Sequence, residues 1–236
     1  MNTKTRDLSG AGAGAAAGVG AAAGAGTAVS AGAGVGAAHS PHPGSGASVV
    51  SFTRMEDGTR EDYDLLDAAE LDYVRALPDH VLGALMKLDH SLPGYPVSRL
   101  GHSLQAATRA WRDGADQELI VAALIHDVGD ELAPYNHSEI AAGIIRPYVR
   151  PEVTWIVEQH GLFQTYYYAH HGGRDRNARD KFLGHPWYQA CKDFCANWDQ
   201  NSFDPRYPCE PLGTFEPLLR EIFSRPAHDP RYVRKA

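Results

Sequence analysis

The segment Glu118–Ile125 reads ELIVAALI and is apolar on nearly every side of a helix. A helix without a polar face must be surrounded by other elements, which predicts a buried helix in a larger core. This helix ends directly in His126 and Asp127, so ionisable groups appear where the core helix stops. Neighbouring helix positions differ by about 100° in direction, so the two side chains cannot both face one packing partner. A shared metal site explains the pair, because imidazole binds one ion and a carboxylate can bridge to another.

Apolar residues also recur at helical spacing along most of the chain after residue 60. Pro78 breaks the first of these predicted helices, whereas Ser98 and Pro151 begin later ones as an N-cap and a first-turn residue. No alternating pattern is long enough for a strand, so the expected fold class is all-α. The expected helices cover residues 60–77, 81–88, 98–114, 118–125, 138–149, 151–160, 186–199 and 215–223, the last packing on the outside.

The first 48 residues differ in composition from the rest of the chain. Half of the 24 glycines lie there, interleaved with alanine and with almost no bulky side chain. Such a segment cannot offset its own ordering entropy, so we expect residues 1–48 to be a disordered extension. A secretory signal is not expected, because glycine and alanine are too weakly apolar for its central region. Residues 49–236 are then expected to form one metal-binding domain.

Charge and cysteine content narrow the class of partner and the compartment. The net charge is −7 and the basic residues are dispersed, so nucleic acid is not an expected partner. No run approaches the roughly 18 apolar residues of a membrane span. The three cysteines form no CxxC pair, which favours buried thiols in a reducing cytoplasm over a disulfide framework. The oligomeric state is left open.

Most polar residues that interrupt the predicted apolar faces are histidines or aspartates, and they lie on five expected helices. A lone histidine on an apolar face is more often a hydrogen-bonded core residue than a ligand. The set as a whole, with its adjacent His-Asp pair, instead indicates a metal site. Four imidazoles and two carboxylates suit iron, manganese, cobalt or zinc better than magnesium or calcium. The candidate metal ligands are His102, His126, Asp127, His137, His160 and Asp199.

In its order of ligands the chain resembles the HD superfamily, in which His102, the His126-Asp127 pair and Asp199 match the basic motif. His137 and His160 resemble the additions of its six-ligand, two-metal branch. That branch contains nucleotide phosphohydrolases and mixed-valent diiron oxygenases, namely myo-inositol oxygenase and the enzymes that cleave organophosphonates. The words LGHSLQ at 100–105 and AALIHDVG at 122–129 are similar to the oxygenase group. The resemblance covers about residues 92–205.

This resemblance implies an HD-type helical bundle holding two Fe ions in a mixed-valent Fe(II)/Fe(III) state, with Mn, Co or another divalent metal as the alternative. It implies that Asp127 bridges the two ions. In such oxygenases a substrate hydroxyl binds one iron and O2 the other, so the implied partners are a small molecule and O2. The implied ligands are His102, His126 and Asp199 for one ion, and His137 with His160 for the other.

Three further positions are candidate catalytic residues because they depart from the family pattern. Asp130 and Gln164 stand where the related oxygenases have cationic side chains. These changes disfavour a phosphonate dianion and suit hydroxyls or a substrate ammonium group. Tyr95 could fill an open iron position through its phenol oxygen, or it could simply pack at a turn. Phosphonate enzymes have a tyrosine and a glutamate where this chain has Leu92 and Tyr95.

One basic cluster lies near the predicted site and has two interpretations. It could hold an anionic group of a substrate, but a charge run at helical spacing is usually a solvated face, which we favour. The members of this cluster are Arg174, Arg176, Arg179 and Lys181.

Three function classes are compatible with these residues. The leading hypothesis is a diiron oxygenase that oxidatively cleaves a small hydroxylated substrate. The alternative is a metal-dependent phosphohydrolase acting on a nucleotide or another phosphoester. The oxygenase is favoured because Asp130 and Gln164 stand where a phosphohydrolase would place cations. A metal-stabilised binding module is the third class, and six intact ligands argue against it.

Overall fold

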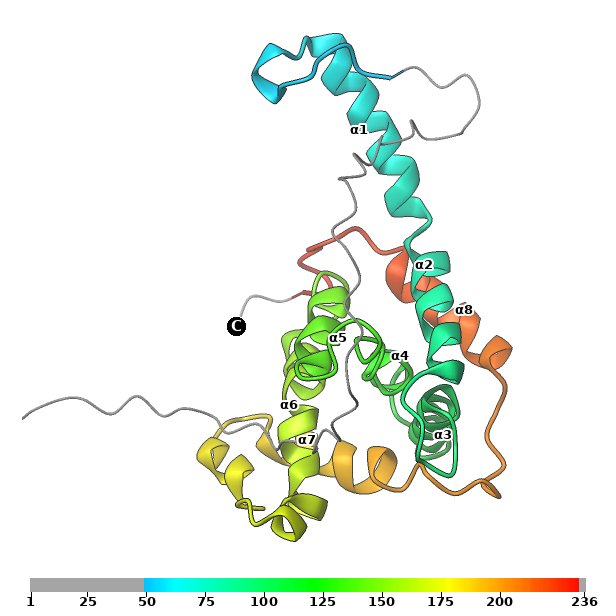
Figure 1. Ribbon diagram of the computed structural model, residues 1–236, viewed down its shortest axis with the longest axis vertical. Coiled ribbons are helices and arrows are strands. Elements are labelled where there is room, and N and C mark those ends of the chain that lie inside the picture. Colours follow the sequence, from blue (N-terminus) through cyan, green and yellow to red (C-terminus); the bar gives the residue numbers. More distant parts are fainter. Residues whose placement is uncertain (1–48, 234–236) are drawn as a thin grey trace, which may run out of the picture. The chain divides into compact units, whose positions relative to one another are not determined.

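The computed structural model describes residues 49–233, and over that range it is helical with no strand (Figure 1). This confirms the all-α class and fits an HD-type helical bundle. The disordered extension expected at residues 1–48 lies outside the described residues. The α-helices are α1 (Arg60–Arg75), α2 (Leu77–Lys87), α3 (Arg99–Arg112), α4 (Gln117–Ile125), α5 (His137–Ile145), α6 (Pro151–Tyr168), α7 (Tyr188–Phe194) and α8 (Leu212–Phe223).

The apolar segment predicted from the sequence forms α4 and lies in the core. Its residues 120–125 are all buried, and α3, α6 and α8 pack around it. The helix begins at Asp116, whose Oδ1 accepts a hydrogen bond of 3.1 Å from the backbone N–H of Leu119. Because every side of α4 is covered, the turn that follows it is held in the interior of the bundle.

Helix α3 has the two ends that its sequence predicts. Ser98 is the N-cap, and its hydroxyl accepts a hydrogen bond of 3.0 Å from the backbone N–H of Gly101. At the other end Gly114 adopts a left-handed conformation with φ of 75°, which glycine tolerates without a steric penalty. The two ends fix where the first turn of α3, with Arg99 and His102, meets the turn after α4.

Three expectations about the helices were wrong. Helix α5 ends at Ile145 rather than near residue 149, because Pro147 cannot donate the backbone hydrogen bond that would continue it. Helix α6 runs to Tyr168, so His160 lies inside this helix and does not close it. Helix α8 is not merely an outer element, since Phe215 and Leu219 are fully buried and it packs on α2 and α4.

The helix expected at residues 186–199 is present as α7 followed by a wider π-helical turn, Cys195–Asp199. Cys191 and Cys195 are free and buried, as the sequence predicted. Their thiols lie 3.7 and 3.6 Å from the backbone carbonyls of Ile156 and His160, which ties this segment to α6. The π-turn, held against α6 in this way, places Asp199 near His160.

No described helix combines the length and the apolar character that crossing a membrane requires.

Candidate metal centre

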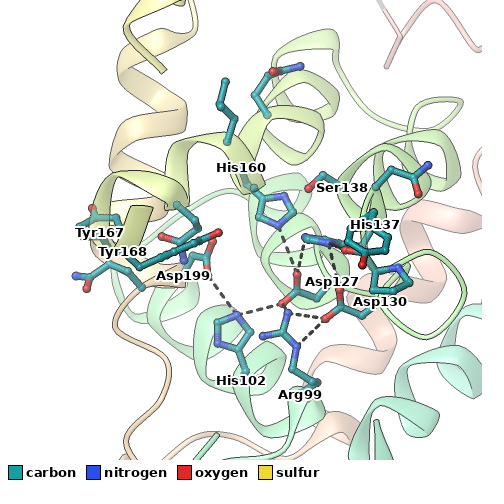
Figure 2. Close-up of a pocket in the computed structure, with 18 of the residues that line it drawn as sticks. Arg99, His102, Asp127, Asp130, His137, Ser138, His160, Tyr167, Tyr168 and Asp199 are labelled. Atoms are coloured by element: carbon teal, nitrogen blue, oxygen red, sulfur yellow. Dashed lines mark hydrogen bonds and ion pairs between the residues drawn. The ribbon is translucent and has the colours of Figure 1, made fainter. Parts of the chain in front are cut away.

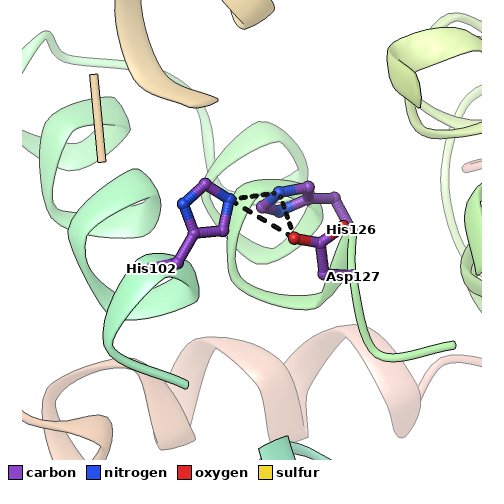
Figure 3. Close-up of side chains that lie close together, drawn as sticks. All are labelled: His102, His126 and Asp127. Carbon is purple, nitrogen blue, oxygen red and sulfur yellow. Dashed lines mark hydrogen bonds and ion pairs between the residues drawn. The ribbon is translucent and has the colours of Figure 1, made fainter. Parts of the chain in front are cut away.

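The structure brings all six predicted ligands together at one place in the bundle. Figure 2 labels five of them, and Figure 3 shows the sixth, His126, beside His102 and Asp127. They come from five separate segments, so this convergence is a property of the tertiary fold. All except His137 are at most 2% exposed, and His137 lies at the edge of an adjoining pocket. The contributions are His102 from α3, His126 and Asp127 from the turn after α4, His137 from the start of α5, His160 from α6 and Asp199 from the π-turn.

The carboxylate of Asp127 lies between two pairs of imidazoles. Its Oδ2 is 3.3 Å from His102 Nε2 and 3.2 Å from His126 Nε2. Its Oδ1 is 3.4 Å from the Nε2 atoms of both His137 and His160. One carboxylate thus offers one oxygen to each pair, which is the arrangement that could bridge two metal ions.

Asp199 lies on the side of the first pair. Its Oδ1 is 3.2 Å from His102 Nε2 and 3.7 Å from His126 Nε2. Its Oδ2 is buried and has no hydrogen-bond partner within the part of the chain that the structure describes. Burying an unpaired carboxylate oxygen is costly, so this atom fits a position that a cation would occupy.

Backbone carbonyls hold the Nδ1 atom of each of the four imidazoles. The Nδ1 to carbonyl distances are 3.0 Å for His102, 2.8 Å for His126, 3.1 Å for His137 and 2.6 Å for His160. A carbonyl can only accept, so Nδ1 carries the proton and Nε2 presents a lone pair.

This choice of tautomer gives a test of whether a metal fits. The Nε2 atoms of His102 and His126 are only 3.0 Å apart (Figure 3). Two lone pairs at that distance repel unless a cation lies between or beside them. With carboxylate oxygens on the same side, the donor set fits a borderline divalent metal ion.

Electrostatics of the metal-free cluster agree with this interpretation. Burial lowers the pKa of His126, but the charges of Asp127 and Asp199 outweigh it and hold the pKa well above its usual value. Burial likewise opposes ionisation of Asp127, yet His126 and Arg99 hold the pKa of this carboxyl well below its usual value. A proton therefore occupies His126 when no metal does, and a metal must displace it.

Arg99 is a functional residue that the sequence reasoning missed. It is buried, and its Nη2 lies 2.5 Å from Asp127 Oδ2 and 2.6 Å from Asp130 Oδ2 (Figure 2). Two spacings in the sequence could have indicated it. Arg99 precedes His102 by three residues on one helix, and Asp130 follows Asp127 by three. The buried guanidinium is thus a cation directly beside the predicted bridge.

Asp130 does not lie as a free carboxylate facing a substrate. Its Oδ2 accepts from Arg99, with the Nε atom at 2.7 Å, and its Oδ1 is 3.1 Å from His137 Nδ1. The expectation that Asp130 repels an anionic substrate is wrong in this respect, because Arg99 offsets the charge. Asp130 instead links Arg99 to a predicted ligand.

A pocket of about 820 Å³ opens onto the cluster, and all three candidate catalytic residues, Tyr95, Asp130 and Gln164, line it. Gln164 has a buried Oε1 with no hydrogen-bond partner in the described structure, so it is an available acceptor. Tyr95 is half-exposed, and its ring stacks on Phe203 with centroids 5.2 Å apart. Phe203 in turn stacks on His102, so the contacts of Tyr95 are those of wall packing.

The basic cluster is only partly the solvated face that we favoured from the sequence, since Arg174 and Lys181 are exposed. Arg179 is only 5% exposed, because its guanidinium stacks on the ring of Tyr166 at 3.8 Å. Arg176 stacks on the same ring at 4.1 Å. Arg174 and Lys181 line the pocket instead. Two cations of the cluster can therefore meet a bound ligand.

Comparisons with known proteins give one informative relative. No protein-family model matches the chain. The chain is 30% identical over 89 residues to the 1-hydroxy-2-(trimethylamino)ethylphosphonate dioxygenase (glycine-betaine-forming) of Leisingera caerulea. The match covers 33% of this chain and 45% of that enzyme, so the chain spans less than half the length of this relative. An oxygenase function agrees with this partial similarity.

Proposed function

We propose that this protein is an oxygenase that uses two metal ions and O2 to cleave a small hydroxylated molecule. The observation that carries the proposal is the position of Asp127, which presents one oxygen to His102 and His126 and the other to His137 and His160. The partial similarity to a dioxygenase supports the choice of reaction.

The residues would hold the two ions unequally. One position would have His102, His126 and Asp199, because Asp199 Oδ1 lies 3.2 and 3.7 Å from the Nε2 atoms of these two histidines. The other would have His137 and His160, and Asp127 would be shared. The second position has fewer protein ligands, which leaves more room for substrate. We propose iron in both positions, in a mixed-valent Fe(II)/Fe(III) pair, because imidazole and carboxylate suit redox-active iron; manganese or cobalt would also fit. Bound there, the ions would supply a Lewis acid for a substrate hydroxyl and electrons for dioxygen.

The chain itself would bind, orient and shield the substrate. Buried side chains of the predicted metal ligands line the inner end of the pocket. A molecule that fills the pocket would therefore exclude water from these side chains. Gln164 Oε1 is free to accept a hydrogen bond from a substrate hydroxyl. The hydroxyl nearest the ions would lose its proton most readily, because two cations stabilise the resulting alkoxide.

The charges of the pocket also bear on the substrate. The relative's name describes a phosphonate that carries a hydroxyl and a trimethylamino group. In this chain Arg174 and Lys181 line the pocket and could pair with an anionic group. Tyr167 and Tyr168 line the same pocket and offer aromatic faces to a cationic group. A hydroxylated substrate with an anionic group is therefore compatible with the pocket, contrary to our sequence-based expectation.

A phosphohydrolase is the second candidate, and one observation favours it. Arg99, Arg174 and Lys181 give the site cations that the sequence interpretation held to be missing. Two ions bridged by a carboxylate can also activate water against a phosphoester. An experiment must therefore distinguish oxygenation from phosphoester hydrolysis.

The test compares oxygen consumption with hydrolysis in one preparation. Protein loaded anaerobically with Fe(II) would be given a panel of hydroxylated compounds, with and without a phosphonate group, in an oxygen electrode. We expect oxygen uptake with at least one of them. After partial oxidation with a limited amount of O2, the protein should show a mixed-valent electron paramagnetic resonance signal that this compound perturbs. Asp127→Ala is the control and should show neither. Hydrolysis of a nucleotide by the Mn- or Co-loaded protein, without oxygen uptake on any hydroxylated compound, would establish the phosphohydrolase instead.

A further inference from the structure

Arg99 places a buried positive charge next to a site that must bind positive ions. Its side chain is only 10% exposed, and its Nη2 is shared between Asp127 Oδ2 and Asp130 Oδ2 (Figure 2). Its Nε makes a further contact of 2.7 Å with Asp130 Oδ2. The guanidinium therefore joins two carboxylates that follow α4, although Arg99 itself lies on α3.

Neither stability nor metal attraction explains this placement. Burying an ion pair costs desolvation, and apolar side chains of similar volume often serve folding as well or better. A cation near two metal ions also opposes their binding by Coulomb repulsion. An arginine at this position must therefore contribute something that a neutral side chain would not.

The contacts of Asp130 indicate what that contribution is. Its Oδ2 is held by Arg99, which leaves Oδ1 directed at His137 Nδ1, 3.1 Å away. His137 Nε2 is in turn 3.4 Å from Asp127 Oδ1. Arg99, Asp130, His137 and Asp127 thus form a closed ring of contacts, with Arg99 touching the opposite oxygen of Asp127.

We propose that Arg99 is a positioning residue that fixes the bridging orientation of Asp127 and, through Asp130, the ring of His137. One guanidinium then sets two of the three protein groups available to the ion at His137 and His160. At the other position Arg99 contacts only Asp127 Oδ2, the oxygen that faces His102 and His126. No ion pair links Arg99 to Asp199 or to either of these histidines among the described residues. The inference rests on the proposed two-metal centre but not on the oxygenase reaction.

The test is a titration of the metal-free protein with Co(II), monitored by visible absorbance and by elemental analysis of the bound metal. Arg99→Lys keeps the charge but loses the planar fork that can reach both carboxylates. We expect this variant to bind the second Co(II) about tenfold or more weakly, the range typical for losing a partner of a metal ligand. The first Co(II) should lose less affinity than the second, because Arg99 does not hold His102, His126 or Asp199 and only Asp127 Oδ2 loses its contact there. The absorbance bands of the second Co(II) should change, because its ligand geometry changes.

Arg150→Lys is the matched control. Its guanidinium also binds carboxylates, but these are Asp116, Glu118 and Glu152 rather than any predicted ligand. This variant should leave both Co(II) affinities and both spectra unchanged. If Arg99→Lys does not fold, Asp130→Asn takes its place, since it removes the charged link to His137 and should weaken the second ion similarly.

Two results would overturn the inference, and they are distinguishable. Unchanged affinities and spectra in Arg99→Lys, or in Asp130→Asn where the first variant does not fold, would remove the positioning role while leaving the proposed function intact. If the protein without substitutions binds fewer than two Co(II) ions per chain, the two-metal centre itself is refuted. A chain that binds two ions without consuming oxygen would refute only the oxygenase reaction, because the titration does not depend on turnover.

Discussion

A histidine ligates a metal through a nitrogen that carries no proton, and here backbone carbonyls select that nitrogen. Each of the four imidazoles donates from Nδ1 to a carbonyl, and for three of them this carbonyl lies three residues earlier in the chain. The exception is His102, which is held by Ser202 from a distant segment. Fixing the orientation of each ring before any metal arrives directs its Nε2 atom at the metal position. Backbone carbonyls therefore orient the four predicted histidine ligands, in addition to any carboxylate that contacts them.

At the residue scale, Asp127→Ala should abolish binding at both metal positions. The change removes the only group whose two oxygens face both imidazole pairs among the described residues, so each position loses a ligand and the negative charge between the ions disappears. Elemental analysis of the purified variant should find less than one metal ion per chain. His137→Ala is the comparison, and it should lose one ion and keep the other. Two ions retained by Asp127→Ala would contradict the bridging role.

The six ligands could be predicted because several imidazoles and carboxylates seldom interrupt apolar helix faces together unless they bind a common cation. Arg99 could not be found in the same way. An arginine at the first position of a helix is usually exposed, and only the folded structure shows that α3 points this one at Asp127. The role of Asp130 was misjudged for the same reason, since its charge cannot be weighed without its partner. Ion pairs between segments that are distant in the sequence depend on the tertiary structure, so a local sequence pattern does not predict them.

At the element scale, the approach of α5 to the turn after α4 depends on a glycine. A Cβ on Gly129 would come within 2.6 Å of the backbone oxygen of His137 and 2.8 Å of Ile140 Cβ. Neither atom can move without shifting the helix, so only glycine permits this close approach. The start of α5, which carries His137, is therefore set by the absence of a side chain in the neighbouring turn.

Gly129→Ala should consequently displace His137 and weaken metal binding. We expect overpacking to lower the free energy of unfolding by about 1–3 kcal/mol, with a weaker second Co(II) position. Gly143→Ala, within α5, is the control, because nothing lies within 4 Å of its added Cβ. That variant should change stability by less than about 1 kcal/mol, or raise it. Urea unfolding and Co(II) titration measure both effects, and equal behaviour of the two variants would argue against steric crowding at Gly129.

The extent of several helices was less predictable than their existence. Helix α6 continues for eight residues beyond His160, because nothing in GLFQTYYY breaks a helix and its buried face packs on α7. The sequence showed a start at Pro151 but offered no stop. Helix α5 ends at Ile145, two residues before Pro147. The periodic isoleucines had suggested that the helix continues past this proline. A ligand can thus be identified correctly while its place along the helix is not.

At the scale of the whole molecule, we propose that residues 49–236 fold as one domain without help from the preceding segment. Residues 1–48 have too few bulky side chains to contribute an apolar face. Removing them should leave the melting temperature and the metal content of the protein unchanged. Differential scanning calorimetry on the full and shortened chains measures this directly. A fall of several degrees in the shortened chain would mean that the segment packs against the domain.

The charge balance of the centre makes the stability of the whole molecule depend on pH in opposite ways with and without metal. Burial lowers the pKa of His102, but hydrogen bonds to Asp127 and Asp199 raise it above its usual 6.5, and the pKa of His126 is raised further. A group with a raised pKa stabilises the folded state fully below its unfolded pKa and loses this contribution as pH rises through the folded value. The metal-free protein should therefore lose stability as pH rises above about 6.5.

Acid has the opposite effect on the carboxylates of the same cluster. Burial opposes ionisation of Asp127, but His126 and Arg99 depress its pKa, so its contribution is present above the usual 3.8 and is lost as pH falls through the folded value. Between these limits the metal-free cluster is at its most stable, with protonated imidazoles beside ionised carboxylates. A bound metal ion replaces those imidazole protons, so its affinity must increase as pH rises.

Melting temperatures of the metal-free and Co(II)-loaded proteins at about pH 6 and about pH 8 measure this exchange of protons for metal. Because metal binding releases protons from His102 and His126, the increase in melting temperature that Co(II) causes should be larger at the higher pH. The metal-free protein should show the reverse trend and melt lower there. Asp127→Ala serves as the control, since without the bridge Co(II) should raise its melting temperature little at either pH. The increase caused by Co(II) could instead stay constant or shrink from about pH 6 to about pH 8. That result would mean that the ion does not displace these protons and that its ligands are not His102 and His126.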